Sequence, residues 1–438
     1  MHFNIPVVEE QIDMLGGRFA VYHVYLDGLL YCKVKYSDMY KWDEELRRIF
    51  GDCLPPFPPN YYLSMTETME DERRLLLEQY LQKVSANSSI STHDVYTFLR
   101  KMQQETFKIP IQNCVLEVLL PDGDKVTADI QSSDPAERVL EIVFCKMELP
   151  RHMLGYFNLF LVEGVSGGQY SVLKRLAPFE LPYVTLKSVN DEQCRIMIRK
   201  SYFDPDIDRT VMENSRGLNL LYLQAVSDMG MGCWTPTNKQ LLKLRSLQET
   251  GQKKEFLEVA QQVKHYGYMQ AEACICEHPE PNSPTVVRVG FEEINCCAKL
   301  LSNQAEETSF EISKVKCWSV RLLGTSTRNP SEEGDIKLEF SFEYCYGNDT
   351  WKWITIHTHQ AFLLSTFMRQ VQAEHAAKNL DLFEEMKIEM PDLQIKTKQS
   401  VPQYLKTDKA RSTLTRIKSA VRGIKEDSVF EGIEDKDL

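Results

Sequence analysis

Three neighbouring segments near the start of the chain carry residue types that can bind an anion. Segment 32–37 alternates like a strand and includes Lys35, while segment 72–81 has an amphipathic helical pattern and includes Arg73. Between them, the proline run 54–59 cannot continue a helix or a sheet and favours a stiff path. Where such cations converge they can bind a membrane phosphate. Ordinary solvated surface remains the alternative on these residues alone.

Composition narrows the classes of protein to which the chain can belong. Its 438 residues are enough for two to four domains, and the net charge of -12 argues against a general nucleic-acid binder. The 12 cysteines form no short, dense framework, and no secretory signal opens the chain, which indicates reduced thiols in the cytosol. No run of about 18 apolar residues occurs, so we expect any membrane contact to be peripheral.

The first hundred residues predict a compact α+β unit. Two strands span 19–37 around Asp27-Gly28, a strong hairpin-turn signal. A helix follows over 38–50, and after the proline run come helices over about 70–84 and 94–107.

This order of elements resembles the PX domain of sorting nexins, and Lys35-Tyr36-Ser37, Phe57-Pro58-Pro59 and Arg73-Arg74 carry the resemblance. The resemblance implies that Lys35, Tyr36 and Ser37 hold the 3-phosphate of a phosphoinositide, that Asn60 faces the 1-phosphate and that Arg73 holds inositol hydroxyls. Lys35 replaces the usual Arg and loses its bidentate fork, and Asn60 replaces a Lys. Both changes are expected to weaken binding. Tyr61, Tyr62 and Leu63 form an aromatic tip suited to the lipid interface.

The rest of the ordered chain predicts three further units. Hairpin 113–130, a helix capped by Asp134 and strands over 157–173 describe a ubiquitin-like β-grasp. Helical patterns fill 205–266, as Pro205–Arg216, Leu218–Met229, Asn238–Glu249 and Lys253–Tyr266. Alternating strands between 286 and 356, closed by a helix over 358–377, describe a PH/PTB-like sandwich.

A β-grasp, a helical bundle and a PTB-like sandwich in this order resemble a FERM module. Joined to a PX domain, they resemble the PX–FERM sorting nexins, the group of sorting nexins 17, 27 and 31, with the altered lipid motif favouring the 31 branch. The fold class is thus α+β multidomain with a flexible tail. The implied units are a PX domain (1–108), a first lobe (112–200), a helical second lobe (201–271), a PTB-like third lobe (272–380) and a tail (391–438).

In this family the third lobe binds Asn-Pro-x-Tyr or Asn-x-x-Tyr motifs in receptor tails of the integrin β, lipoprotein-receptor or uroplakin type. A peptide would add to an exposed edge strand beside the last helix. The strand we expect in this role is 317–321, which contains Trp318, Ser319 and Val320. The resemblance matches Trp318 to the family's peptide-contacting tryptophan, and we expect Phe367 and Val371 of the helix to face it. The alternative is that Trp318 is simply a core residue.

The tail carries two further signals. Segment 406–425 is basic and has apolar residues at helical spacing, which is typical of a membrane-binding helix or of a disordered basic linker. The acidic end contains Phe430, Ile433 and Leu438, and in the sorting nexin 17 group such an end engages the retriever recycling complex.

No catalytic or metal motif stands out. Cys274-x-Cys276-x-His278 and His357-x-His359 lack the spacing of a zinc site. We therefore predict no enzyme activity and no cofactor, but a cytoplasmic adaptor on early endosomes that binds phosphatidylinositol 3-phosphate and receptor tails and promotes recycling over lysosomal degradation. The alternative is a signalling scaffold whose β-grasp lobe binds an activated Ras-type GTPase.

Overall fold

The computed structural model describes residues 1–378 except Leu15, 61–65, 88–89, 91–92, 167–168, 190, 303, 324–336 and 348–349. The predicted membrane tip (Tyr61, Tyr62, Leu63), the basic segment 406–425 and the terminal motif (Phe430, Ile433, Leu438) therefore lie outside the described residues. Across the described ranges, no helix combines the length and the apolar character needed to cross a bilayer.

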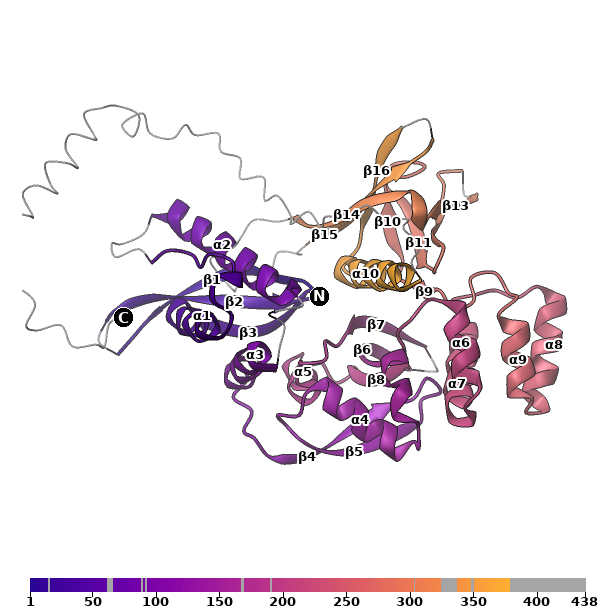
Figure 1. Ribbon diagram of the computed structural model, residues 1–438. Coiled ribbons are helices and arrows are strands. Elements are labelled where there is room, and N and C mark those ends of the chain that lie inside the picture. Colours follow the sequence, from indigo (N-terminus) through magenta and orange to yellow (C-terminus); the bar gives the residue numbers. More distant parts are fainter. Residues whose placement is uncertain are drawn as a thin grey trace, which may run out of the picture. The chain divides into compact units, whose positions relative to one another are not determined.

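The N-terminal domain is a three-stranded antiparallel sheet covered by helices (Figure 1). Its elements are β1 (Phe3–Ile12), β2 (Arg18–Leu26), β3 (Leu29–Lys35), α1 (Tyr36–Phe50), α2 (Glu67–Ala86) and α3 (His93–Thr106). The sequence analysis did not predict β1. The register of β1 with β2 is irregular between Asn4 and Val7. The predicted strand 32–37 was too long, because Tyr36 and Ser37 already belong to the first turn of α1.

The next lobe is a five-stranded sheet in the order β5-β4-β8-β6-β7, in which β4 and β8 run parallel. Its elements are β4 (Asn113–Leu119), β5 (Lys125–Gln131), α4 (Ala136–Lys146), β6 (Phe157–Ser166), β7 (Gln169–Arg175), α5 (Pro182–Ser188) and β8 (Arg195–Lys200). This is the predicted β-grasp. Asp134 does not cap α4, however, because Pro135 is the N-cap residue and the Asp134 carboxylate accepts from the Gln131 amide at 2.8 Å.

A small helical lobe follows, made of α6 (Pro205–Met212), α7 (Ser215–Gly230), α8 (Asn238–Glu249) and α9 (Lys253–Ala260). The first of these helices is shorter than predicted. Asn214 ends the run, because its side chain accepts from the amides of Arg216 and Gly217 and so caps α7.

The last lobe is a strongly bent antiparallel sheet closed by one helix. Its elements are β9 (Met269–Gln270), β10 (Cys274–Cys276), β11 (Ser283–Val289), β12 (Glu293–Lys299), β13 (Ala305–Glu311), β14 (Val315–Leu323), β15 (Lys337–Cys345), β16 (Trp351–His357) and α10 (Ala361–Ala377). The strand order is β13-β12-β11-β10-β16-β15-β14, which makes β13 and β14 the two edges among the described strands. Helix α10 packs against β14 and β15.

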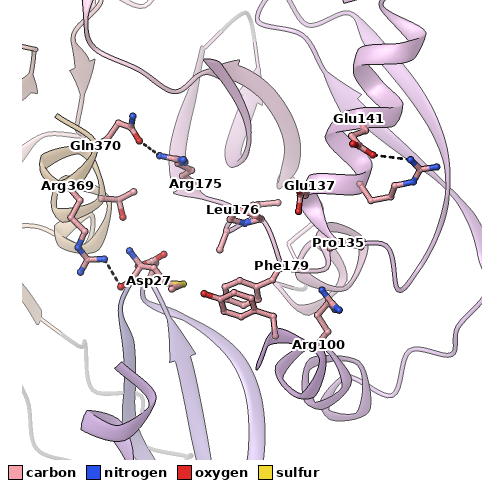
Figure 2. A pocket seen from close by; sticks show the side chains of 16 residues that line it. Asp27, Arg100, Pro135, Glu137, Glu141, Arg175, Leu176, Phe179, Arg369 and Gln370 are labelled. Carbon is pink, nitrogen blue, oxygen red and sulfur yellow. Dashed lines mark hydrogen bonds and ion pairs between the residues drawn. The ribbon is translucent and has the colours of Figure 1, made fainter. Parts of the chain in front are cut away.

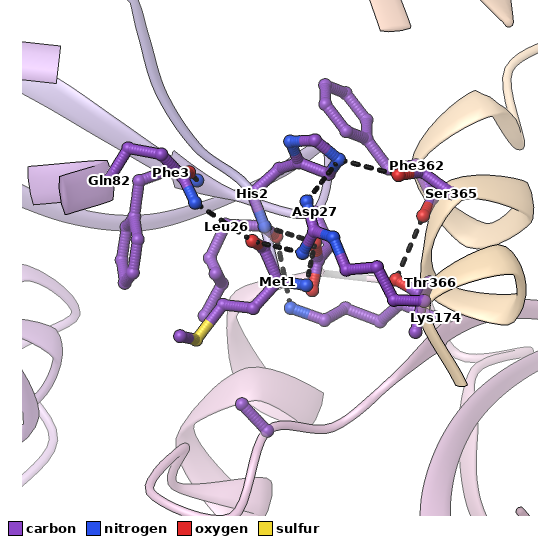
Figure 3. Close-up of polar contacts among 12 residues, drawn as sticks. Met1, His2, Phe3, Leu26, Asp27, Gln82, Lys174, Phe362, Ser365 and Thr366 are labelled. Carbon is purple, nitrogen blue, oxygen red and sulfur yellow. Dashed lines mark hydrogen bonds and ion pairs between the residues drawn. The ribbon is translucent and has the colours of Figure 1, made fainter. Parts of the chain in front are cut away.

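The turn between β2 and β3 joins the N-terminal domain to the lobes that follow (Figure 3). Asp27 and Gly28 both have left-handed backbone angles, φ 50° and 87°, as a tight hairpin turn requires. A Cβ on Gly28 would lie 3.0 Å from the Phe362 ring of α10. Lys174 of β7 donates to the Leu26 carbonyl at 3.0 Å. A turn that the sequence predicted as a local feature is thus also an interdomain contact.

Candidate functional site

The predicted lipid pocket is built around Arg73, which is buried rather than solvated. Its Nε donates to the Tyr22 hydroxyl at 3.0 Å, and its guanidinium lies 4.7 Å from the centre of the Tyr36 ring. No carboxylate within the described residues pairs with Arg73. A buried cation without an anionic partner is costly, so this position favours an anionic ligand.

Tyr36 and Arg47 fix the proline-rich loop beside this pocket. The Tyr36 hydroxyl donates to the Pro58 carbonyl at 2.8 Å, and Arg47 donates to the Pro55 carbonyl at 2.8 Å. Burial raises the pKa of Tyr36 to about 12, so its hydroxyl keeps the proton that it donates. Two anchored carbonyls hold the proline-rich loop in one path as far as Pro58.

The other lipid-site residues are more exposed than Arg73. Lys35 ends β3, and its amine lies 4.1 Å from the centre of the Phe19 ring. Ser37 is half-buried in α1, and Asn60 is exposed. The structure therefore brings Tyr36 and Arg73 into contact and leaves Lys35 and Asn60 on the surface.

Two residues in this pocket were missed by the sequence analysis. Tyr22 holds the Arg73 side chain, and Phe19 lies under the Lys35 amine. A plain two-residue hairpin would pair Tyr22 with Lys33, but a bulge between Val24 and Tyr25 shifts this partner to Val34. The turn signal was visible in the sequence, but the bulge was not.

The predicted peptide-binding strand, β14, lies at an edge of the last sheet. It pairs with β15 on one side, and the described strands provide no partner on the other. A free edge presents unpaired backbone donors and acceptors, to which a peptide strand can add. The position of α10 against this strand supplies the second wall that the prediction required.

The side chains assigned to peptide contact are all buried. Trp318 is 1% exposed, and its Nε1 donates to Ser365 Oγ at 2.9 Å. Ser319 and Val320 on β14, and Phe367 and Val371 on α10, are also in the core. A ring enclosed in this way supports the strand and the helix rather than offering a contact surface. The peptide role of these five residues stays a prediction that their burial does not favour.

Ser365 also connects this lobe to the N-terminal domain. Its Oγ lies 2.7 Å from His2 Nε2, which in turn lies 2.7 Å from Arg369 Nη2. Because arginine can only donate, His2 Nε2 must be an acceptor, and the neutral ring carries its proton on Nδ1. A continuous chain of hydrogen bonds thus runs from Trp318 through Ser365 to His2, the residue before β1; Figure 3 shows its part between Ser365 and His2.

One group of potential metal ligands occurs among the described residues. The ligand atoms of Glu163, Asp191 and Cys194 lie within 4.8 Å of one another. Burial and a hydrogen bond to Asp191 raise the pKa of Glu163. A proton shared between the two carboxylates accounts for their approach, so the cluster needs no ion.

Comparison with known proteins matches most of the chain to four family models. These are the PX domain (residues 30–102), the sorting nexin 17/27/31 FERM F1 lobe (114–203), the sorting nexin 17/31 FERM F2 lobe (204–264) and the sorting nexin 17 FERM C-terminal domain (267–376). The predicted order of domains is that of the matched models.

Full-length relatives agree with these models. Human sorting nexin-31 is 43% identical over 100% of both chains, and human sorting nexin-17 is 40% identical over 86% of this chain and 82% of that one. A solved MyTH4-FERM structure of Dictyostelium discoideum myosin VII aligns at 10% identity with a TM-score of 0.42, covering 76% of this chain and 74% of that one. The fold assignment rests on the family models.

Proposed function

This chain belongs to the PX–FERM sorting nexins of the 17/31 branch, and we propose that it binds receptor tails and phosphatidylinositol 3-phosphate on early endosomes. Proteins of this family are endosomal sorting adaptors rather than enzymes. The cargo carries an Asn-Pro-x-Tyr or Asn-x-x-Tyr motif and is recycled instead of degraded. The proposal retains the domain boundaries given above from the sequence.

The position of β14 at the edge of the described strands, beside α10, is the observation that supports cargo binding. The strand spans Val315–Leu323, long enough for a short peptide to add as a further antiparallel or parallel strand. Its exposed side chains include Lys316 and Arg321, while Trp318 and Val320 anchor its inner face. Main-chain hydrogen bonds would supply affinity, and the groove beside α10 would select the tyrosine.

Hydrogen exchange tests this mode of binding directly. An Asn-Pro-x-Tyr peptide should protect amides of β14, because a new strand occupies their free edge. The matched control is β13 (Ala305–Glu311), the opposite edge of the same sheet, whose exchange should not change. A second control is the same peptide with Ala in place of Tyr. Equal protection of both edges, or protection of neither at saturating peptide, would contradict strand addition to β14.

The lipid part of the proposal rests on the unpaired, buried guanidinium of Arg73 next to Tyr36. Lys35 adds a second charge at the end of β3. The family pattern has an Arg where this chain has Lys35 and a Lys where it has Asn60, so we expect this site to bind phosphate more weakly. We therefore expect lipid and cargo to act together on one membrane. Flotation on vesicles with and without phosphatidylinositol 3-phosphate measures this contribution.

Retriever is the proposed partner of the terminal segment that contains Phe430, Ile433 and Leu438. Residues added after Leu438 would block a motif that needs the terminal carboxylate. They should abolish recovery of retriever in a pull-down while leaving peptide binding intact. Undiminished recovery with the extended chain would refute this partner.

A Ras-type GTPase at the β-grasp lobe remains the second candidate. Strand β5 (Lys125–Gln131) is an open edge of that sheet, to which another strand could pair. At this edge Asp129 is paired with Lys146 and Lys125 with Glu117, both at 2.7 Å, so these charges are already matched within the lobe. Nucleotide-dependent capture of a GTPase would separate this function from cargo sorting.

A further inference from the structure

A cavity of about 700 Å³ lies where the N-terminal domain meets the first and last lobes of the FERM module (Figure 2). Its walls come from the tip of the β2–β3 hairpin, from α3, from α4, from the end of β7 with the loop that follows, and from α10. The volume is within the range of roughly 300 to 1,000 Å³ that is usual for small-molecule sites. Neither the lipid pocket nor the β14 edge contributes to it.

One wall of the cavity carries two guanidinium groups, from Arg175 and Arg369. Arg175 donates to the Gln370 side chain at 2.8 Å, whereas Arg369 donates to the Met1 carbonyl at 2.5 Å and to His2 Nε2 at 2.7 Å. All of these acceptors are neutral. Arg369 Nε is buried and has no hydrogen-bond partner. Burial lowers the pKa of both arginines, and this effect exceeds the opposing effect of Asp27, which raises the pKa of both.

No carboxylate contacts these arginines directly. Neither guanidinium forms an ion pair with a carboxylate in the described part of the chain, although Asp27 lies near enough to both to favour their charged forms. Asp27 itself accepts from the His2 amide at 2.7 Å, and Glu141 on the opposite wall is already paired with Arg138 and Arg151 at 3.0 and 2.7 Å. An entering anion would therefore gain two guanidinium partners that no carboxylate occupies.

The remaining walls of the cavity carry both charged and apolar side chains. Arg100, Glu137 and the paired Arg138 and Glu141 lie there with Tyr96 and Pro178. Phe179 is 4% exposed, and its ring stacks on the half-buried Tyr96 with 4.0 Å between ring centres. Figure 2 shows Phe179 and Arg100 across the cavity from Arg369. The site thus has two cations on one side and a mixed surface that includes the Tyr96 ring on the other.

We propose that this cavity binds a small phosphomonoester with an apolar or aromatic body. Arg175 and Arg369 contact the phosphate oxygens, and the Tyr96 ring with Pro178 receives the body. A phosphate carries up to two negative charges and so balances two guanidinium groups, whereas one carboxylate balances a single group. Because the walls come from three domains, the bound ligand also holds those domains together and stabilises the chain by mass action.

Calorimetry on the full chain with three simple probes tests the chemistry. Phenyl phosphate should bind most tightly, inorganic phosphate more weakly, and phenol, which lacks the charge, not at the same concentration. Arg175→Gln should weaken phenyl phosphate at least ~10-fold, since a charge-assisted hydrogen bond is lost. Arg175→Lys should recover part of the affinity, because it restores the charge without the fork.

Two matched controls identify the site. Arg138→Gln removes a cation of the same cavity that is already paired with Glu141, and Lys35→Gln removes a cation of the lipid pocket. Arg138→Gln should bind phenyl phosphate like the unmodified chain, and Lys35→Gln should retain the part of the binding that Arg175→Gln removes. Thr366→Glu places a carboxylate in the cavity from α10 and should abolish binding even if Arg175→Gln does not fold.

Three results would overturn the proposal. They are the absence of saturable binding of phenyl phosphate to the unmodified chain, undiminished binding in folded Arg175→Gln or Thr366→Glu, and loss of binding in Lys35→Gln alone. Flotation on phosphatidate vesicles then identifies the source of the phosphomonoester. Sensitivity of flotation to Thr366→Glu assigns the site to a lipid head group, and insensitivity assigns it to a soluble molecule.

Discussion

The indole nitrogen of Trp318 donates a hydrogen bond to Ser365 Oγ at 2.9 Å, which ties the edge strand β14 to helix α10. The same hydroxyl lies 2.7 Å from His2, so the contact also reaches the N-terminal strand. The two sides of the proposed peptide groove are therefore held by one buried polar link.

Replacing Trp318 should reduce stability before it affects binding. Trp318→Ala removes a ring that is 1% exposed, and such changes cost about 3 to 5 kcal/mol of unfolding free energy. Trp318→Phe keeps most of the packing and loses the hydrogen bond, at about 1 to 2 kcal/mol. Urea unfolding of both variants measures the difference. Identical midpoints for Trp318→Ala and the unmodified chain would show that the ring does not support the core.

The two lysines of β3 should differ in their effect on lipid binding. Lys35→Gln should weaken flotation on phosphatidylinositol 3-phosphate vesicles about 10-fold, because one charged contact to phosphate is lost. Lys33→Gln is the matched control, since Lys33 is on the same strand but its amine lies 3.2 Å from Glu9. If both variants float equally, the effect reflects general surface charge rather than the pocket.

The free energy of unfolding should decrease as the pH is lowered, in part because of His2. Burial, and then the Arg369 guanidinium, hold the pKa of His2 well below its ordinary 6.5. Below pH 6.5 the unfolded chain takes up a proton that the folded chain does not, so acid favours unfolding, by at most about 1.4 kcal/mol per pH unit from this residue. Urea unfolding at pH 7.5 and 5.5 should show a smaller loss in His2→Gln.

The exposed His359 provides the control for this pH experiment. His359→Gln should retain the pH dependence of the unmodified chain, because the His359 ring makes none of the contacts of His2. An unchanged slope in His2→Gln would mean that the contacts of His2 with Ser365 and Arg369 do not govern acid stability.

Gly28→Ala should loosen the junction between the N-terminal domain and the rest of the chain. The new Cβ would strain a left-handed backbone and lie 3.0 Å from the Phe362 ring, with an expected loss of roughly 1 to 3 kcal/mol. Gly123→Ala has a similar φ of +94° with nothing within 4 Å, so it isolates the backbone strain. The excess loss in Gly28→Ala, measured by thermal unfolding, reports the interdomain contact. Equal losses in the two variants would indicate that Phe362 moves aside without cost.

Much of the fold could be predicted from local patterns. The Asp27-Gly28 turn, the long helix that contains Arg73 and the alternation of the late strands each reflect interactions between residues close in sequence. The errors also have local causes: Asn214 ends a helix earlier than the apolar spacing indicated, and Tyr36 begins one within a predicted strand. Side chains that cap helices can end or begin a helix at a residue where the spacing of apolar residues would continue the element. The apolar spacing alone does not show where this happens.

Motif and order were enough to identify the family, because PX and FERM elements in sequence form a specific combination. The sequence by itself therefore determined the order of the domains and the positions of the candidate lipid residues. Only the tertiary structure decided what surrounds them. Arg73 is buried against Tyr22 of β2, to whose hydroxyl it donates, and Trp318 is buried because α10 covers its strand. These contacts join residues far apart in the chain, and packing rather than local pattern selects them.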